Sequence, residues 1–271
     1  MQRVFITGAS SGLGEALARH YAREGAFVAL VGRRANLLEA LRTSLPHPEQ
    51  HRVYALDVTD HAALQAAAAD FAGAYDGVDV VIANAGISQG TLTSHAEDLA
   101  VFEQIVAVNL NAVVATFSAM LPVMLAQRTP RRPPVFPPRL VCIASVAGIR
   151  GLPGASAYSA SKAAVISYCE SLRVELHGSG IRVVTIVPGY IDTPMTRLNR
   201  YRMPFLMPAD KFARRAVAVI DAGGSYRVIP WQMGVVAKLL RSLPNALYDR
   251  LFANAPHKAR LSPSQERPHS D

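Results

Sequence analysis

The sequence predicts an α/β fold: a single doubly wound parallel sheet of about seven strands with helices on both faces. Three observations predict it. Short apolar runs without polar alternation recur along the first 190 residues, which is typical of parallel strands covered on both faces. Helical patterns separate these runs, so strand and helix alternate. The 271 residues are 50% apolar and only 18% charged, which allows one large core.

The elements follow in a regular order. A glycine-rich or polar turn ends most of the apolar runs, and a helical pattern then begins. We expect strands at 4–6, 26–31, 53–56, 78–82, 140–143, 183–187 and 225–230. We expect helices at 13–24, 35–45, 60–75, 97–126 and 157–178.

The remaining segments have other predicted roles. One domain covers 1–252 and includes a substrate flap at about 190–215. An amphipathic segment at 231–252 is interrupted by Pro244, and 253–271 is expected to be a frayed, disordered tail because it is polar and rich in Pro and Ser. The segment 127–138 contains five prolines, which predicts a solvent-facing loop; a proline-motif ligand is the alternative.

The net charge of +8 is confined to the last quarter of the chain. Residues 1–196 carry 15 basic and 15 acidic side chains, whereas 197–271 carry 13 basic and 5 acidic ones, and 13 − 5 = 8. Nucleic-acid binding is not expected, because no recognition motif is present and the charges are mixed with Leu and Val. We expect 231–252 to pack on the domain or on a partner, with a lid or peripheral membrane contact as alternatives.

Several features favour a cytoplasmic protein. The chain begins without the apolar stretch of a signal peptide. The apolar run from Leu110 to Ala126 has 17 residues, fewer than the roughly 20 that span a bilayer. Cys142 and Cys169 are too few for a disulfide scaffold and are expected to be buried. No histidine pair has the spacing of metal ligands, so no metal site is predicted.

A glycine-rich turn follows the first expected strand and opens the first helix. It has glycines at 8, 12 and 14 in the pattern G-x-x-x-G-x-G. Such a turn lets the backbone approach a diphosphate, and the helix start offers free N–H groups to it. The alternative is a tight strand-to-helix turn without a ligand.

The end of the second strand indicates which dinucleotide binds. An acidic residue there would accept hydrogen bonds from the 2′-hydroxyl of NAD, but this chain has Arg33 and Arg34. A guanidinium can hold a 2′-phosphate with two parallel hydrogen bonds, which favours NADP(H) over NAD(H). Two solvated arginines are the alternative.

Tyr158 and Lys162 are four residues apart in a helical pattern and therefore share a face. Lys162 is the only lysine before Lys211 in a chain that otherwise uses arginine. An ammonium ~4 Å from a tyrosine hydroxyl favours the phenolate by about 4 kcal/mol at an effective dielectric of ~20, which brings proton exchange toward neutral pH. Ser145 follows the fifth strand, where such sheets bind ligands, and can hold a substrate carbonyl against Tyr158.

With these residues in order, the chain from Val4 to about Thr196 resembles the short-chain dehydrogenase/reductase family. The likeness rests on the glycine turn, Asp57-Val58, Asn84-Ala85-Gly86, Asn109, the Ser145–Tyr158–Lys162 set, and Pro188-Gly189 with Thr193. The resemblance implies that Asn109, Ser145, Tyr158 and Lys162 are catalytic. It implies cofactor contacts from Gly8, Ser10, Ser11, Gly12, Leu13, Gly14, Arg33, Arg34, Asp57, Val58, Asn84, Ala85, Gly86, Tyr158, Lys162, Pro188, Gly189, Ile191 and Thr193.

The resemblance also implies a reaction. Hydride passes between C4 of the nicotinamide and a carbonyl carbon while Tyr158 donates or removes the proton. Lys162 assists Tyr158 and binds the nicotinamide ribose, and Asn109 holds a proton-relay water. The family often has Asn and Ser where this chain has Ala83 and Ala144, neither of which is a proposed catalytic group.

We therefore predict an NADP(H)-dependent oxidoreductase of the carbonyl reductase or alcohol dehydrogenase type. The flap contains Tyr190, Met195 and further apolar side chains among arginines, which suits a bulky apolar carbonyl or secondary alcohol, with or without an anionic end, and with Ser145, Tyr190 and Met195 as its contacts. The equal alternative is that these side chains only pack the flap onto the sheet. A homo-oligomer, dimer or tetramer, is expected. The alternative is a non-catalytic NADP(H)-binding regulator, associated or not with a membrane surface.

Overall fold

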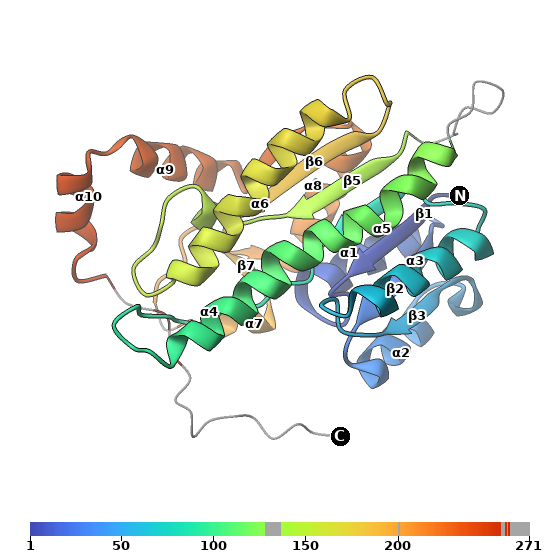
Figure 1. Ribbon diagram of the computed structural model, residues 1–271, viewed down its shortest axis with the longest axis horizontal. Helices are drawn as coiled ribbons and strands as arrows, with labels where there is room; N and C mark the ends of the chain where they lie inside the picture. Colours follow the sequence, from blue (N-terminus) through green and yellow to red (C-terminus); the bar gives the residue numbers. More distant parts are fainter. Residues whose placement is uncertain (128–136, 200, 256–257, 259, 261–271) are drawn as a thin grey trace.

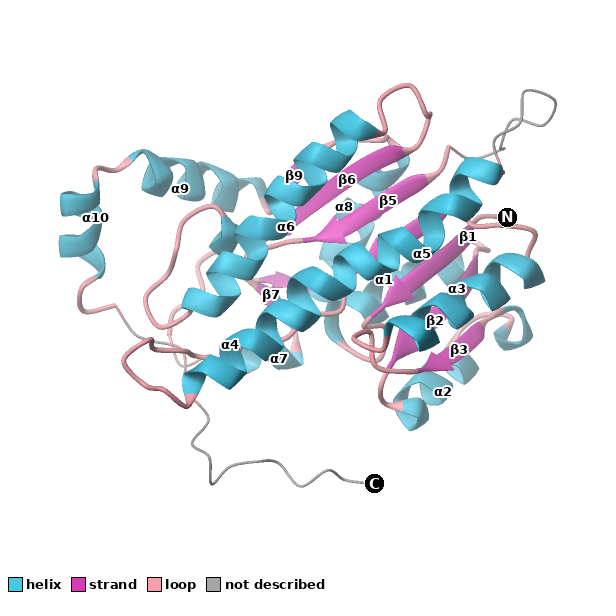
Figure 2. Cartoon of the chain, viewed as in Figure 1, coloured by secondary structure: helices cyan, strands magenta, loops and turns pink. Residues whose placement is uncertain are grey.

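A seven-stranded, wholly parallel sheet forms the centre of the molecule, and helices cover both of its faces (Figures 1 and 2). The computed structural model describes residues 1–127, 137–199, 201–255, 258 and 260. Most of the predicted proline-rich loop, 128–136, lies outside the described residues. The strands of this sheet are β1 (Arg3–Thr7), β2 (Phe27–Gly32), β3 (Arg52–Ala55), β4 (Val80–Ala83), β5 (Arg139–Ile143), β6 (Arg182–Pro188) and β9 (Tyr226–Ile229). The predicted fold class is confirmed.

The strands lie in the order β3-β2-β1-β4-β5-β6-β9. From β1 the chain adds β2 and β3 on one side, and then β4, β5, β6 and β9 on the other, so the order of addition reverses between β1 and β4 while all strands stay parallel. These two neighbours are in register from Val4 opposite Val80 to Ile6 opposite Ile82, so their carboxyl ends lie together. In open parallel sheets this reversal opens a crevice beyond the strand ends, because the following helices leave to opposite faces. The predicted glycine turn and Asn84 both emerge at that point.

Each face of the sheet buries its own apolar cluster. On one face α1 (Gly12–Arg23), α2 (Ala35–Ser44) and α8 (Ala209–Asp221) contribute to it, with Leu17, Leu38 and Phe212 fully buried. On the other face α3 (His61–Ala74), α5 (Ala112–Ala126) and α6 (Ser156–Glu175) contribute to it. Cys142 and Cys169 are buried in this second cluster, as predicted.

The predicted helix at 97–126 has an irregular middle. It consists of α4 (Asp98–Val106), a π-helical segment (Ala107–Asn111) and α5. By length and composition alone this span of 29 residues could cross a membrane, since an 18-residue window within it has a mean hydropathy of 1.7. It instead lies along the sheet, with Phe117 and Met120 in the core. We interpret it as an apolar core helix.

The segment after β6 is more structured than sequence analysis anticipated. The predicted flap, 190–215, covers β7 (Ile191–Asp192), α7 (Pro194–Arg197), β8 (Met207–Pro208) and the start of α8. The strands β7 and β8 pair with each other in a small parallel sheet. We did not predict α8, although its buried residues have helical spacing: Phe212, Ala213, Ala216, Val217 and Ile220.

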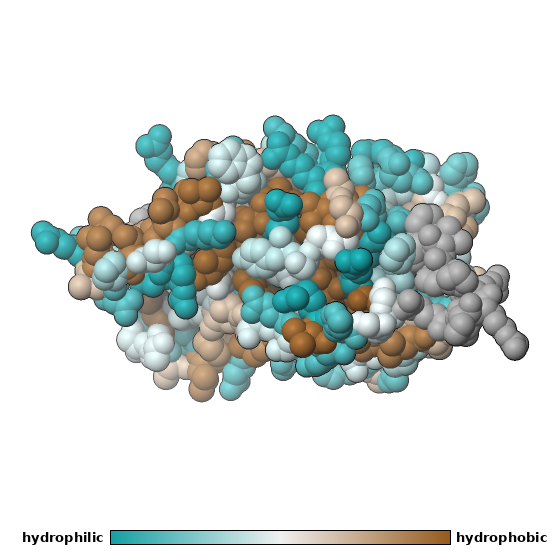
Figure 3. All heavy atoms as spheres, turned by 90° about the horizontal axis from the view of Figure 1, so that it is seen from above, coloured by the Kyte–Doolittle hydropathy of each residue, from teal (hydrophilic) through white to brown (hydrophobic). Residues whose placement is uncertain are grey.

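The C-terminal elements extend from one end of the molecule (Figure 1). The predicted amphipathic segment forms α9 (Trp231–Ser242) and α10 (Asn245–Phe252), which are separated at Pro244. The inner side of α9 packs through Met233 and Ala237, whereas Trp231 and Leu239 are about two thirds exposed. Figure 3 shows apolar surface at this end. In the predicted tail, Lys258 and Arg260 contact the body of the domain, and 261–271 lie outside the described residues.

Candidate active site

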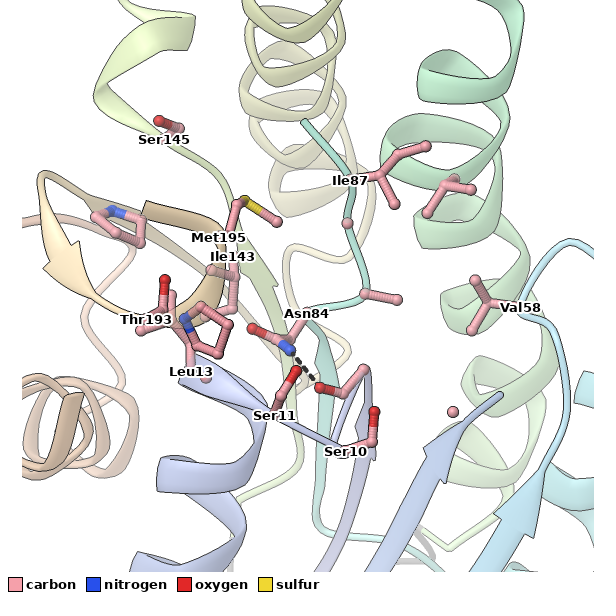
Figure 4. A pocket seen from close by; sticks show the side chains of 18 of the residues that line it. Ser10, Ser11, Leu13, Val58, Asn84, Ile87, Ile143, Ser145, Thr193 and Met195 are labelled. Carbon is pink, nitrogen blue, oxygen red and sulfur yellow. Dashed lines mark hydrogen bonds between the residues drawn. The ribbon is translucent and has the colours of Figure 1, made fainter. Parts of the chain in front are cut away.

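A cleft of about 440 Å³ opens at the carboxyl ends of the strands, where β1 and β4 diverge (Figure 4). It brings together most of the residues that sequence analysis selected. These are Gly8, Ser10, Ser11, Gly12, Leu13, Arg33, Arg34, Asp57, Val58, Asn84, Ala85, Gly86, Ser145, Tyr158, Lys162, Pro188, Gly189, Ile191, Thr193 and Met195. It also includes residues that no motif indicated, among them Leu56, Ile87, Gln104, Val108 and Ile143.

The glycine turn is shaped by close backbone contacts. Gly8 and Gly12 have φ of +68° and +62°, in the left-handed region that favours glycine. A Cβ on Gly8 would lie 2.8 Å from the Cα of Ala85, and one on Gly14 would lie 2.2 Å from the carbonyl oxygen of Gly8. Gly14 is buried and does not line the cleft, so its role is to let α1 pack against the turn.

Asn84 holds the turn from the neighbouring strand. Its Nδ2 donates to the carbonyl oxygens of Thr7 (3.0 Å) and Gly8 (3.3 Å), while the Thr7 hydroxyl accepts from the backbone N–H groups of Asn84 and Ala85. These bonds aim the amide of Asn84 at the turn and leave the helix start facing the cleft (Figure 4). The arrangement fits a dinucleotide diphosphate, because free N–H groups and the positive end of α1 meet it.

Arg34 lies across the same turn. Its Nη2 donates to the hydroxyls of Ser10 (2.8 Å) and Ser11 (2.7 Å), and its Nε also contacts Ser10. Arg33 points elsewhere: its Nη1 is 3.6 Å from a carboxylate oxygen of Asp57, and its side chain is 64% exposed. Burial alone would raise the pKa of Asp57, but hydrogen bonds from Thr59 and the charge of Arg33 hold that pKa below its usual value. A carboxylate and a guanidinium therefore face the cleft side by side.

Ser145, Tyr158 and Lys162 converge from β5 and α6. Lys162 is 5% exposed, and its Nζ donates to the carbonyl oxygen of Ile143 at 2.9 Å. The same Nζ lies 5.9 Å from the centre of the Tyr158 ring. The Ser145 oxygen accepts from the backbone N–H of Ala147 at 3.2 Å, which leaves its hydrogen free to donate into the cleft.

Asn109 lies behind the cleft and does not line it. Its side chain is fully buried in the π-helical segment. Its Oδ1 accepts from the backbone N–H of Ile87 (2.8 Å), and its Nδ2 donates to the carbonyl oxygen of Ile87 (3.0 Å) and to the Ser161 hydroxyl (3.1 Å). Ser161 in turn donates to the carbonyl oxygen of Tyr158. Asn109 thus joins the loop after β4 to the helix that bears Tyr158.

The two predicted substrate contacts on the flap are placed differently. Met195 lines the cleft, and its side chain appears beside Thr193 in Figure 4. Tyr190 does not line the cleft and packs edge-on against Tyr201, with the ring centres 6.3 Å apart. Burial and the nearby Tyr190 and Tyr158 raise the pKa of Tyr201 to about 12, so Tyr201 stays neutral near Tyr158. Among the described residues, no group of His, Cys, Asp and Glu side chains could hold a metal ion.

The chain is similar to known proteins in sequence and in fold. A family model described as short chain dehydrogenase matches residues 2–203. An uncharacterized oxidoreductase of Myxococcus xanthus is 37% identical over 90% of this chain and 93% of its own length. The 2-dehydro-3-deoxy-L-rhamnonate dehydrogenase (NAD(+)) of a Sphingomonas species is 37% identical over 70% of this chain and 72% of its own. A 3-ketoacyl-(acyl-carrier-protein) reductase from Brucella melitensis, solved in complex with NADH, has a TM-score of 0.75 at 25% identity and covers 84% of this chain and 96% of its own.

The parallel sheet and the cleft at its switch point define a dinucleotide-binding α/β protein. The chain belongs to the short-chain dehydrogenase/reductase family and is an NAD(P)-dependent oxidoreductase. The predicted family and enzyme class are confirmed.

The buried amide of Asn109 provides a test of how the site is supported. Replacing Asn109 with Ala leaves both backbone groups of Ile87 without their partners, so we expect the free energy of unfolding to fall by about 2–3 kcal/mol. Asn111 is exposed two residues further along the same span, and Asn111→Ala should change stability by less than about 0.5 kcal/mol. Urea unfolding measures both; equal losses would contradict this role.

Proposed function

We propose that the enzyme transfers hydride between NADP(H) and a bulky apolar carbonyl or secondary alcohol, with Tyr158 as the acid or base. The observation that carries the proposal is the meeting of Ser145, Tyr158 and Lys162 in the same cleft as the glycine turn. When bound, the nicotinamide cofactor supplies or accepts the hydride. The protein binds it, orients the substrate oxygen and moves one proton at that oxygen.

Each of the three polar side chains has a defined task. The Ser145 hydroxyl, whose oxygen already accepts from Ala147, donates to the substrate oxygen and fixes it. The Tyr158 hydroxyl gives its proton to that oxygen in reduction and removes one in oxidation. The buried Lys162 ammonium stabilises the phenolate that remains.

The preference for NADP(H) is supported by Arg34. Its guanidinium lies over the Ser10 and Ser11 hydroxyls at the start of α1. A 2′-phosphate of the adenine ribose would accept hydrogen bonds from the guanidinium and from both hydroxyls, and those from the guanidinium would be charge-assisted. Arg33, paired with Asp57, is the weaker contributor.

The substrate class is supported by the side chains of the flap. Met195 offers an adaptable apolar surface at the cleft, and Tyr201 adds an uncharged ring near Tyr158. These groups favour an apolar body on the substrate, with its oxygen toward Ser145.

We also propose that the enzyme is a cytoplasmic homo-oligomer. The outer face of α5 exposes Val114 and Leu125, and that of α6 exposes Val174, although both helices cover the same side of the sheet. Apolar residues on adjacent helices of a folded domain favour contact with a second copy. The reduced, buried Cys142 and Cys169 agree with a reducing compartment.

Replacing Tyr158 with Phe tests the reaction. The ring still packs, but the proton donor is lost, so we expect kcat with NADPH to fall by about 10²- to 10⁴-fold across a carbonyl panel. Binding of NADPH, followed by its fluorescence, should change by less than about threefold. Full turnover of every substrate that the native enzyme accepts would refute the role of Tyr158.

Replacing Arg34 with Ala tests the cofactor preference. The loss of charge-assisted hydrogen bonds to a 2′-phosphate should raise the Kd of NADPH by about 10- to 100-fold and leave the Kd of NADH within about twofold. Arg23→Ala, an exposed arginine at the far end of α1, is the matched control. Equal weakening of NADPH and NADH would show that Arg34 does not read the 2′-phosphate.

Replacing Val114 and Leu125 together with Glu tests the assembly. Two charges on an apolar interface should convert the oligomer to monomers, as measured by light scattering after size-exclusion chromatography. Leu239→Glu on the exposed side of α9 is the control and should leave the oligomer intact. A native enzyme that is monomeric at 50 µM, or dissociation by the α9 variant alone, would contradict the proposed interface.

A further inference from the structure

Lys258, which follows α10 in the chain, lies beside the active site. The Nζ of Lys258 lies 5.6 Å from the centre of the Tyr158 ring and donates to the hydroxyl of Ser88 at 2.5 Å. Ser88 follows Ile87, which lines the cleft, on the loop after β4. A lysine 170 residues away in sequence thus lies beside the Tyr158 ring, next to the residues that line the cleft.

Arg260, two residues further along the chain, is bound to two carboxylates of the domain. Its guanidinium makes two bonds to the Asp98 carboxylate, at 2.8 and 3.0 Å, and one to Glu97 at 3.0 Å. Asp98 is nearly buried and also accepts from the backbone N–H of Leu92. A guanidinium bonded to two carboxylates fixes the chain at Arg260. The contact of Lys258 is therefore not needed for that purpose.

The ammonium of Lys258 has a different environment. In the described part of the chain no carboxylate forms an ion pair with it, and its polar contact is the neutral Ser88 hydroxyl. Burial lowers the pKa of Lys258 to about 8, so the ammonium form still predominates at pH 7. A half-buried charge without a counter-charge is costly, and an anion beside it would offset that cost.

Lysine is rare in this chain, so the contacts of Lys258 can be compared with those of Lys162, the other lysine near Tyr158. It has four lysines among 28 basic residues, and two of these four lie within 6 Å of the Tyr158 ring centre. Lys162 donates to the carbonyl oxygen of Ile143, and its proposed task is to stabilise the phenolate of Tyr158. Lys258 instead contacts Ser88 on the loop after β4.

We propose that Lys258 is a specificity-determining residue that binds the carboxylate of an oxo acid or hydroxy acid whose reacting oxygen lies at Tyr158. The proposal rests on the function proposed above. A carboxylate one or two bonds from the reacting carbon would lie on the Lys258 side, while the apolar remainder faces Met195 and Tyr201. Arg197 of the flap does not offer the same contact, since it is paired with Asp192 on the exposed side of α7.

Matched acids and esters test this assignment. With NADPH, benzoylformate and 2-oxo-4-phenylbutanoate are compared with methyl benzoylformate and ethyl 2-oxo-4-phenylbutanoate. We expect the native enzyme to favour the acids, and Lys258→Gln to lower kcat/KM for the acids by about 10- to 100-fold while changing the esters by less than about threefold. Lys238→Gln, an exposed lysine on α9, is the control and should change neither.

The possible outcomes separate this proposal from the proposed function. Equal losses for acids and esters, no loss for either, or a native enzyme that favours esters throughout would overturn the role of Lys258. If the native enzyme reduces none of the four compounds, calorimetric titration of the NADP⁺-loaded protein with benzoylformate decides. Binding that Lys258→Gln weakens at least tenfold supports the carboxylate site, and absent or unchanged binding overturns it.

Discussion

The site depends on the close backbone approach between the turn after β1 and the loop after β4. A Cβ at Gly8 or Gly14 would collide with backbone atoms of this junction, and Asn84 bonds to the carbonyl oxygens of Thr7 and Gly8 across it. Because β1 and β4 are neighbours in the sheet, their register places these groups opposite each other. The contact fixes the direction in which α1 leaves the sheet, and with it the position of every N–H group that faces the cleft.

A second set of hydrogen bonds connects the loop after β4 to α6, the helix that bears Tyr158. Asn109 hydrogen-bonds to the backbone N–H and carbonyl oxygen of Ile87 and donates to the Ser161 hydroxyl. The Ser161 hydroxyl in turn donates to the carbonyl oxygen of Tyr158. The π-helical segment is what turns this amide inward: a π-helical residue widens the turn, and such segments are common at functional sites. The loop after β4 and the helix that bears Tyr158 are therefore joined through one buried side chain.

The seven strands and the cofactor cleft could be predicted from the sequence because their signals are local. Apolar runs mark buried parallel strands, and the glycine turn must follow the first of them. Supporting roles could not be separated from direct contacts: Gly14 and Asn109 belong to the same motifs as cleft residues, yet both lie outside the cleft. Lys258 carried no local signal, since its place beside Tyr158 follows from a fold-back that only tertiary structure creates. The helix α8 did carry a periodic signal, which we did not use.

The basic excess of the last quarter takes on a different meaning in the folded chain. Arg260 is neutralised by Glu97 and Asp98, which belong to the balanced first 196 residues, and Arg197 is neutralised by Asp192. The Arg260–Asp98 pair is partly buried and joins Arg260 to the domain, whereas the Arg197–Asp192 pair lies within the flap and is exposed. A guanidinium suits such pairs because it bonds two carboxylate oxygens at once, whereas a lysine ammonium is a compact charge that a small anion can approach. Arg260 and Arg197 pair with carboxylates, whereas Lys162 and Lys258 lie beside the Tyr158 ring, and this division follows from the chemistry of the two side chains.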